Sequence, residues 1–224
     1  MQHVKLPWQL VIVGAFFALA AADPFTPARY RSGPLPAITV EAVGGGQVFL
    51  ELTVSSTGTV SAVKPLRSTP PFTGPLTEAV QQWQFRPAEE LVEPAPGAPS
   101  ALVRKRVDSK VFVAGMFRPP SLNAPTLGTP PEDVAPESDE TPFPIAAVMP
   151  AYPPLARDSG VVLVEVRVGR TGQVIDAAAV RSTPPFDVPA LDAARRWTFR
   201  PARVHGASVE SFAYIAFAFR QPVT

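Results

Sequence analysis

The hydrophobic pattern of the chain predicts two β-hairpins of the same design. Val48 to Val54 is rich in β-branched and aromatic residues, Ser55 to Gly58 supplies turn residues, and a second apolar run follows. The same succession, VVLVEVRV, GRTG and QVIDAAAV, occupies residues 161–180. We therefore predict hairpins at 47–66 and 161–180. Gly58 and Gly172 should take positive φ in the loops, which glycine does at no steric cost.

A short amphipathic helix is predicted after each hairpin. Pro189 stands at or near the first position of the second helix, where a missing N–H costs little. This helix runs to Trp197, and the matching one spans Pro75–Trp83. We interpret Trp83 and Trp197 as core contacts between helix and sheet and not as ligand-stacking residues, because they share the helical apolar spacing. The apolar face of the second helix consists of Ala190, Ala193, Ala194 and Trp197, at i, i+3, i+4 and i+7.

Proline-containing motifs flank each helix, and a final strand closes each unit. Ser-Thr-Pro-Pro-Phe precedes the helix and Phe-Arg-Pro-Ala follows it, and proline interrupts both helices and central strands. We predict the final strands at 106–118 and 209–220. The first unit has about 12 more residues before its final strand, including EPAPGAPS. We interpret this segment as a proline-rich loop, either a disordered tip or a contact loop.

The two units are copies of one sequence. Residues 48–88 align with residues 162–202 without a gap at an offset of 114, and 19 of the 41 positions are identical. Two copies of so long a period favour tandem copies of one small domain over a solenoid. We place domain 1 at 38–118 and domain 2 at 151–222.

The segments outside the repeat carry different signals. Residues 1–22 contain one lysine and a short apolar run that ends in three alanines. This pattern predicts a signal peptide cleaved after Ala22, with Ala20 as the second possible site. An uncleaved N-terminal anchor is the alternative. Residues 23–36 are expected to be irregular. Residues 119–150 predict a proline-rich linker that separates the two domains.

The two domains are expected to begin differently. Residues 151–160 predict a short helical turn closed by Gly160 as a C-cap. The aligned residues 38–46 keep only Ala42 and Gly46 in register, so the first copy has a degenerate beginning that is compatible with a strand.

Composition and charge narrow the class of protein. Proline accounts for 29 of the 224 residues, and cysteine is absent, which excludes a disulfide framework and a Cys-based zinc site. Residues 1–22 carry one charged side chain, Lys5, so the rest of the chain has 19 basic and 19 acidic residues. We expect no nucleic-acid partner, because that affinity comes mainly from neutralising phosphates.

No catalytic or metal-binding set is evident in the sequence. His3 and His205 are the only histidines, and His205 precedes a glycine in the turn before the last strand. No carboxylates or histidines are spaced as metal ligands. Glu51 and Glu165 occupy equal strand positions in the two domains and are interpreted as surface or cross-strand charge partners. We predict that the protein is not an enzyme and has no cofactor.

An ordered set of motifs in the second unit points to a known family. It comprises Tyr152-Pro153, Gly172 in the hairpin, Leu191-Asp-Ala-Ala194 and Trp197-Thr-Phe-Arg-Pro201. This order resembles the C-terminal domain of TonB-like energy transducers over about residues 150–222, and residues 38–118 resemble it more weakly. The resemblance implies an α+β fold. Each domain would have an antiparallel three-stranded sheet with one or two helices on one face.

The resemblance also implies a non-catalytic periplasmic protein that grips an extended segment of an outer-membrane transporter by strand addition. The candidate edge strand runs from Val209 to Phe219. The alternative is that this strand is core on one face and covered by a neighbour on the other, or hidden by a second subunit. The partner-binding candidates are Val209, Ser211, Phe212, Ala213, Tyr214, Ile215, Phe217, Phe219 and Tyr152.

The sequence departs from a full transducer at its N-terminus. Such a transducer carries an anchor with a motor-coupling histidine and a long proline-rich spacer. Here His3 precedes the apolar run, and about 15 residues separate Ala22 from the first repeat. We therefore predict an exported periplasmic protein that binds a partner such as a TonB-dependent outer-membrane receptor, with inner-membrane attachment only if residues 1–22 are retained. The alternative is a structural envelope protein whose repeats pair, or which forms a homodimer.

Overall fold

In the described parts of the chain the fold is α+β, mostly β with two helices, and is built on one six-stranded sheet. The computed structural model describes residues 23–38, 44–94, 101–120 and 138–222. The sheet has the order β11-β10-β15-β8-β3-β4. Its strands are β3 (Gly46–Val54), β4 (Val60–Arg67), β8 (Ser109–Phe117), β10 (Gly160–Val168), β11 (Val174–Arg181) and β15 (Ser211–Phe219).

The two copies are joined within this sheet. Each copy contributes three antiparallel strands, and the copies meet where β15 pairs in parallel with β8, from Ala213 opposite Phe112 to Ala218 opposite Phe117. The expectation of two separated domains is therefore wrong. Residues 121–137, the greater part of the predicted linker, lie outside the described residues.

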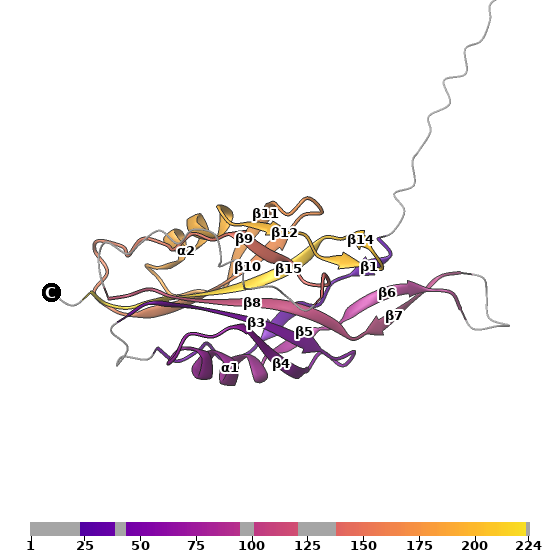
Figure 1. Ribbon diagram of the computed structural model, residues 1–224, viewed down its shortest axis with the longest axis horizontal. Helices are drawn as coiled ribbons and strands as arrows, with labels where there is room; N and C mark the ends of the chain where they lie inside the picture. The colour runs from indigo at the N-terminus through magenta and orange to yellow at the C-terminus, as the bar shows by residue number, and fades with distance from the viewer. Residues whose placement is uncertain (1–22, 39–43, 95–100, 121–137, 223–224) are drawn as a thin grey trace, which may run out of the picture.

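Parallel pairing of two equivalent strands places the helices on opposite faces. It relates the copies by an approximate twofold rotation about an axis along the strands, and this rotation exchanges the faces of the sheet. Accordingly, α1 (Thr73–Gln81) packs on one face and α2 (Asp187–Arg195) on the other (Figure 1). On β10, Val162 and Val164 belong to the core cluster of α2, whereas Leu163 belongs to that of α1. Both copies therefore share both cores.

The two helices begin and end two residues earlier than the sequence predicts. Pro189 is the third residue of α2, still inside the first turn, where backbone N–H groups have no partner within the helix. Trp197 lies just beyond the helix and is 1% exposed, and Trp83 is fully buried. Their indole N–H groups donate to the backbone oxygens of Val148 (3.0 Å) and Pro34 (2.8 Å). The interpretation of both tryptophans as core residues is confirmed.

Short two-stranded ribbons flank the sheet, and the sequence did not predict them. β2 (Arg29–Ser32) pairs with β5 (Gln84–Arg86), and β9 (Phe143–Ala146) pairs with β12 (Thr198–Arg200). Their partners keep the repeat offset of 114 residues. β1 (Phe25–Thr26) is a further short strand, so the prediction that residues 23–36 are irregular is wrong. The predicted linker likewise contains β9. Strands of two to four residues are too short to show a reliable alternation of side chains.

A two-stranded arm extends from the first copy. β6 (Ala88–Val92) and β7 (Val103–Val107) pair antiparallel and form a small sheet with β1, and Figure 1 shows them projecting from one end of the molecule. Of the predicted loop at 93–100, Glu93 and Pro94 follow β6, and residues 95–100 lie outside the described residues. The second copy has in its place only β13 (Arg203–Val204) and β14 (Ala207–Ser208).

Glycine decides the geometry of both hairpin loops. Gly58 and Gly172 have φ values of 90° and 89°, as predicted, and a Cβ at either position would collide with the backbone oxygen of Phe85 or Phe199. The prediction for Gly160 is wrong. Gly160 begins β10 and does not cap a helix. A side chain is excluded at this position because a Cβ would collide with Thr183 and the ring of Phe186.

Two predictions in the N-terminal part of the chain fall wholly or mostly outside the described residues. These are the signal peptide or anchor at 1–22 and most of the possible strand at 38–46, where residues 39–43 are not described. Within the described ranges, the helices are too short and too polar for one of them to traverse a lipid bilayer.

Candidate partner-binding surfaces

The predicted binding strand lies inside the sheet. β15 pairs with β10 along one side and with β8 along the other, so the prediction of a free edge at 209–219 is wrong. Two long, regular, apolar strands from the two copies satisfy each other's backbone groups, which removes the exposed edge that each would otherwise present.

Both faces of β15 are covered as well. The predicted alternation holds, since Ile215 packs in the cluster of α2 and Tyr214 packs with Trp83 in the cluster of α1. Among the predicted binding residues, only Phe212 and Val209 keep partial exposure, and the Val209 N–H donates to the Ala202 oxygen at 3.0 Å. The buried members are Ser211, Ala213, Tyr214, Ile215, Phe217 and Phe219.

Tyr152 has a structural place next to α2. Its ring centroid lies 5.7 Å from that of Phe186, and its hydroxyl donates to the Asp158 oxygen at 2.7 Å. Burial raises the pKa of this phenol. With 5% of its surface exposed, Tyr152 offers little contact area to a partner.

Glu165 is the centre of a buried polar cluster that ties the N-terminal segment to the second copy. The Tyr214 hydroxyl donates to its Oε2 at 3.0 Å, and Arg29 approaches its Oε1 at 2.9 Å. The Tyr30 N–H donates to the Tyr214 hydroxyl at 2.6 Å. Burial and then the Glu165 charge hold the pKa of Tyr214 well above its ordinary value, and the hydrogen bond to Glu165 raises the pKa of Arg29.

Glu51 has an equivalent position and different partners. Lys110 Nζ lies 2.8 Å from its Oε1, and the Thr141 hydroxyl donates to its Oε2 at 3.3 Å. Glu51 and Glu165 are 3% and 4% exposed, so their interpretation as surface charges is wrong, whereas Lys110 on β8 is a cross-strand partner of Glu51. Because a buried charge is costly unless it is paired, both carboxylates restrict which segments can pack beside them.

The outer strands of the main sheet carry features that hinder strand addition. The β3–β4 ladder has irregularities next to Leu50 and Val54, and β4 contains Pro65. The β10–β11 ladder has irregularities next to Val164 and Val168. Bulges and proline protect sheet edges from pairing with another chain.

The arm strand β7 is the more open edge. Its five residues pair with β6 in unbroken register, and its other side has no strand partner within the described ranges. Four of its residues, Val103 to Arg106, are exposed. The sequence pattern did not indicate this edge, because it predicted a strand only at residues 106–118.

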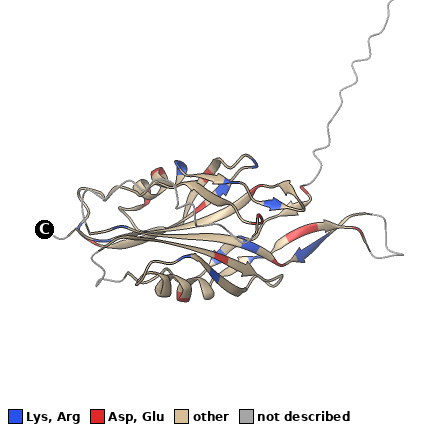
Figure 2. Ribbon diagram, in the orientation of Figure 1, with Lys and Arg blue, Asp and Glu red and all other residues tan. Residues whose placement is uncertain are grey.

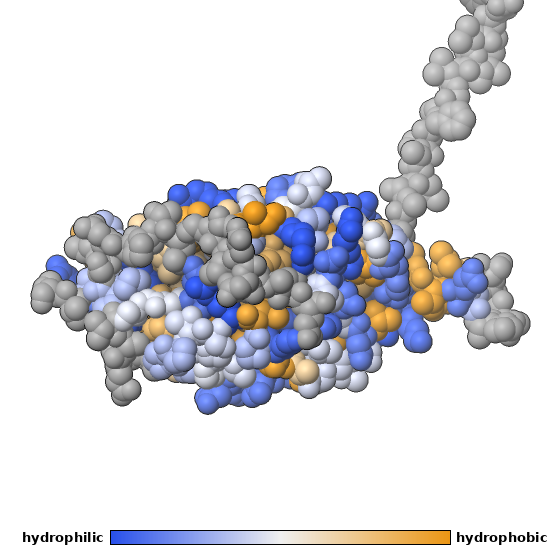
Figure 3. Space-filling view, in the orientation of Figure 1, coloured by the Kyte–Doolittle hydropathy of each residue, from blue (hydrophilic) through white to orange (hydrophobic). Residues whose placement is uncertain are grey.

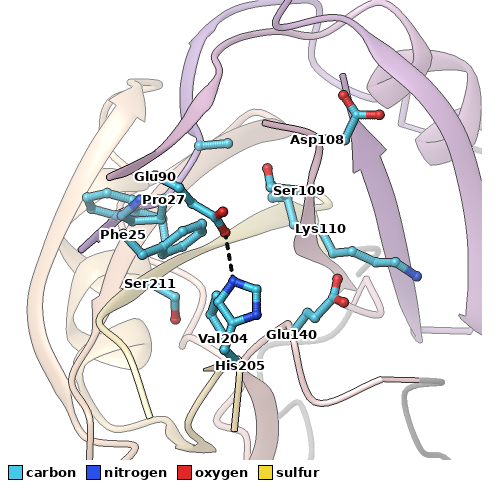
Figure 4. A pocket seen from close by; sticks show the side chains of 13 residues that line it. Phe25, Pro27, Glu90, Asp108, Ser109, Lys110, Glu140, Val204, His205 and Ser211 are labelled. Carbon is cyan, nitrogen blue, oxygen red and sulfur yellow. Dashed lines mark ion pairs between the residues drawn. The ribbon is translucent and has the colours of Figure 1, made fainter. Parts of the chain in front are cut away.

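A polar pocket lies where β8 and β15 begin, and Figure 4 shows its lining. His205 Nε2 lies 3.4 Å from Glu90 Oε1, with Lys110 and Glu140 nearby. The volume of this pocket, about 140 Å³, is below the range typical of small-molecule sites. The described residues contain no group of His, Cys, Asp and Glu placed to hold a metal ion.

Comparison with known proteins finds a family that the second copy resembles. Residues 148–220 match the family described as the Gram-negative bacterial TonB protein C-terminal. The match supports the resemblance of this part of the chain to the TonB C-terminal domain family, as the motifs around Tyr152 and Trp197 predicted. A search of curated proteins finds no match to the chain.

The matched family indicates the class of protein. It is a non-enzymatic family, consistent with the prediction that the chain is not an enzyme. Its members are envelope proteins, periplasmic or anchored in the inner membrane, that take part in TonB-like energy transduction and interact with outer-membrane receptors.

Proposed function

We propose that the protein is a non-catalytic envelope protein that binds an extended segment of an outer-membrane receptor by strand addition, in the service of energy-dependent transport. The observation that carries this proposal is the family match over residues 148–220. Strand addition needs a sheet edge with free backbone groups. Because β15 is paired on both sides, we assign the partner to another edge, and β7 is the one with an exposed and regular backbone.

The proposed place of action is the periplasm. The alanine-rich end of the apolar run at 1–22 supports export by a cleaved signal peptide. Retention of that run would instead leave an inner-membrane anchor. Direct coupling to a motor has weaker support, because the run contains no histidine and His3 lies ahead of it.

A structural role is the second candidate, and one observation favours it. The two copies pair with each other through β8 and β15, which is the arrangement expected of a protein whose repeats serve its own assembly. In this case the first copy would complete the second, and the chain would engage no receptor.

Site-specific photo-crosslinking in the producing cell tests the proposed function. A photoreactive residue at Val103, which is 52% exposed on β7, should yield an adduct with the N-terminal extended segment of an outer-membrane receptor, identified by mass spectrometry. The matched control places the same photoreactive residue at Leu155, which is 93% exposed and precedes β10. It should yield no receptor adduct. Adducts confined to a second copy of the chain would favour the structural role.

A further inference from the structure

An unusual concentration of arginine covers the β2–β5 ribbon. Arg29 of β2 lies directly opposite Arg86 of β5, and Arg31 lies at the register irregularity between Tyr30 and Ser32 and lines the same pocket. Tyr30 and Phe85, the alternate residues, point inward and pack against Trp83. Like charges placed opposite each other in a ribbon are unfavourable, so this arrangement costs stability unless an anion is present.

Only one of these guanidinium groups has a carboxylate partner. Arg29 is paired with Glu165. Arg31, Arg86 and the neighbouring Arg106 of β7 form no ion pair with any residue in the described parts of the chain. The nearest acidic residue in the register is Glu89, which lies opposite Arg106 in the arm. The three arginines and Glu89 together carry a net charge of two positive units.

The arginines surround a hollow. A pocket of about 420 Å³ is lined by side chains of the ribbon, the arm and the first hairpin loop. Phe85 and Pro87 are its buried members, so they provide an apolar floor between charged walls. This volume falls within the range of ligand sites. The lining residues are Arg29, Tyr30, Arg31, Thr57, Phe85, Arg86, Pro87 and Arg106.

The second copy shows that the fold does not require this charge. The residues equivalent to Arg29 and Arg31 at the repeat offset of 114 are Phe143 and Ile145. The equivalent of Arg86 is Arg200, whose guanidinium lies 3.3 Å from the Asp139 carboxylate. The same ribbon is thus built with apolar residues and a neutralised arginine, so the first copy carries its arginines for another reason.

The basic surface continues onto the open edge of the arm. Arg104 and Arg106 occupy alternate positions of β7 and so lie on one face of it. Figure 2 shows basic residues along β7 and acidic ones along β6, and Figure 3 shows apolar side chains over the same arm. An extended chain alongside β7 would therefore find free backbone groups next to positive charge.

We infer that β7 and the arginine pocket together form a binding site for an extended acidic polypeptide segment, which adds as a strand to β7 and places carboxylates against Arg31, Arg86 and Arg106. This inference deepens the proposed function, since it names the edge and the chemistry of the partner. Arginine suits carboxylates because its fork of donors can hold both oxygens. A polypeptide fits better than a lipid headgroup, because only a polypeptide can use the unpaired backbone of β7.

Peptide binding to the full chain tests the inference. The probe is a labelled Glu-Thr alternating peptide of about ten residues, a typical upper strand length, which presents its carboxylates on one face. A Gln-Thr peptide is its uncharged counterpart. We expect the Glu-Thr peptide to bind, more weakly as salt rises, and the Gln-Thr peptide to bind at least about tenfold less tightly.

A matched pair of triple variants locates the site. Arg31→Gln, Arg86→Gln and Arg106→Gln together should weaken the Glu-Thr peptide by at least about tenfold, since three charge-assisted contacts are lost. The control triple, Arg157→Gln, Arg195→Gln and Arg196→Gln, removes equal charge from exposed positions of the second copy and should have little effect. No binding, or equal weakening by both triples, overturns the inference.

Two further probes separate strand addition from simple charge attraction. Peptides N-methylated at all Glu or at all Thr amides cannot donate from one edge, so one of them should lose binding. If both methylated peptides bind as tightly as the parent peptide, strand addition is overturned. Anionic phosphatidylglycerol vesicles that bind through the same arginines, while the peptide does not, overturn the choice of a polypeptide.

Crosslinking in cells distinguishes failure of the acidic-peptide site from failure of the proposed function. A receptor adduct at Val103 that persists in the Arg31, Arg86 and Arg106 variant leaves the function standing and overturns the acidic site. Binding of the Glu-Thr peptide in vitro without any receptor adduct in cells leaves the site standing and removes the function.

Discussion

Glu165 connects three parts of the chain that are far apart in sequence. Its carboxylate is held by Arg29 from the N-terminal segment and by Tyr214 from the last strand, and Tyr214 in turn accepts from the backbone of Tyr30. Such a cluster is stabilising only when every member is satisfied, because an unpaired buried charge is costly. It therefore fixes the position of β2, and with it the arginines of the proposed site.

Tyr214 makes stability sensitive to alkaline pH. Burial and Glu165 raise the pKa of Tyr214 in the folded state, whereas in the unfolded chain this phenol should titrate at about 10. Above that pH the native protein binds more protons than the unfolded one, so the free energy of unfolding falls as pH rises. Urea unfolding of the wild type between pH 8 and 11 should show this decline.

The variant Tyr214→Phe separates this effect from the loss of hydrogen bonds. It should cost about 1–3 kcal/mol at pH 7, because Glu165 loses one hydrogen-bond donor and the Tyr30 N–H loses its acceptor. Its stability should then fall less steeply above pH 10 than that of the wild type. Equal slopes for the two proteins would show that Tyr214 is not the titrating group.

Single residues were predictable where a local conformation decides them. Gly58 and Gly172 follow from loop geometry alone, and the tryptophans follow from helical spacing. Glu51 and Glu165 were not predictable in the same way, since the groups that pair with them come from other segments. A charged residue in a strand normally indicates an exposed position. It can be buried only where other groups pair with its charge.

Among the elements, β15 differs most from its expected role. Its alternation was read correctly, but alternation describes the two faces of a strand and carries no information about its two edges. The edges are decided by which strand lies beside it, and here β8 does so with an equally regular and apolar run. By contrast, the irregular registers of β4 and β11 suit them to the outside of the sheet.

Hydrogen exchange tests the position of β15 directly. Amides of β15 should exchange among the slowest in the chain, because they belong to ladders on both sides and lie under both cores. Amides of β7 should exchange faster, since its residues are exposed and one side is unpaired. Peptide-resolved mass spectrometry of the full chain measures both, and comparable exchange in β15 and β7 would contradict the central position of β15.

At the scale of the whole molecule, the chain is an assembly of two copies in one polypeptide. The α1 core contains Tyr214 and Leu163 from the second copy, and the α2 core contains Phe49 and Phe112 from the first. The Phe143 ring also packs 6.2 Å from that of Phe49. Because each copy completes the core of the other, the covalent connection ensures that they meet at high effective concentration.

Separating the copies should therefore destabilise both. Residues 138–224 produced alone would expose the β8-facing edge of β15, and we expect this fragment to self-associate or remain unfolded. Produced together with residues 1–120, it should form a one-to-one complex. Size-exclusion chromatography with light scattering measures these states, with the full chain as the reference.

One outcome would overturn the shared architecture. If residues 138–224 alone are monomeric and unfold cooperatively, the second copy is an independent domain and the β8–β15 pairing is dispensable. The family match over 148–220 would then coincide with a complete folding unit.

Local sequence patterns were sufficient to predict the repeat, both hairpins, both helices to within two residues, the α+β class and the resemblance of the second copy to the TonB C-terminal domain family. These depend on local conformation and on side-chain periodicity, which neighbouring residues set. Only the tertiary structure decided that β8 and β15 pair, that the ribbons β2–β5 and β9–β12 exist, and that Arg31, Arg86 and Arg106 meet at one pocket. The physical reason is that strand pairing and charge clustering depend on contacts between distant segments, whose geometry no local pattern records.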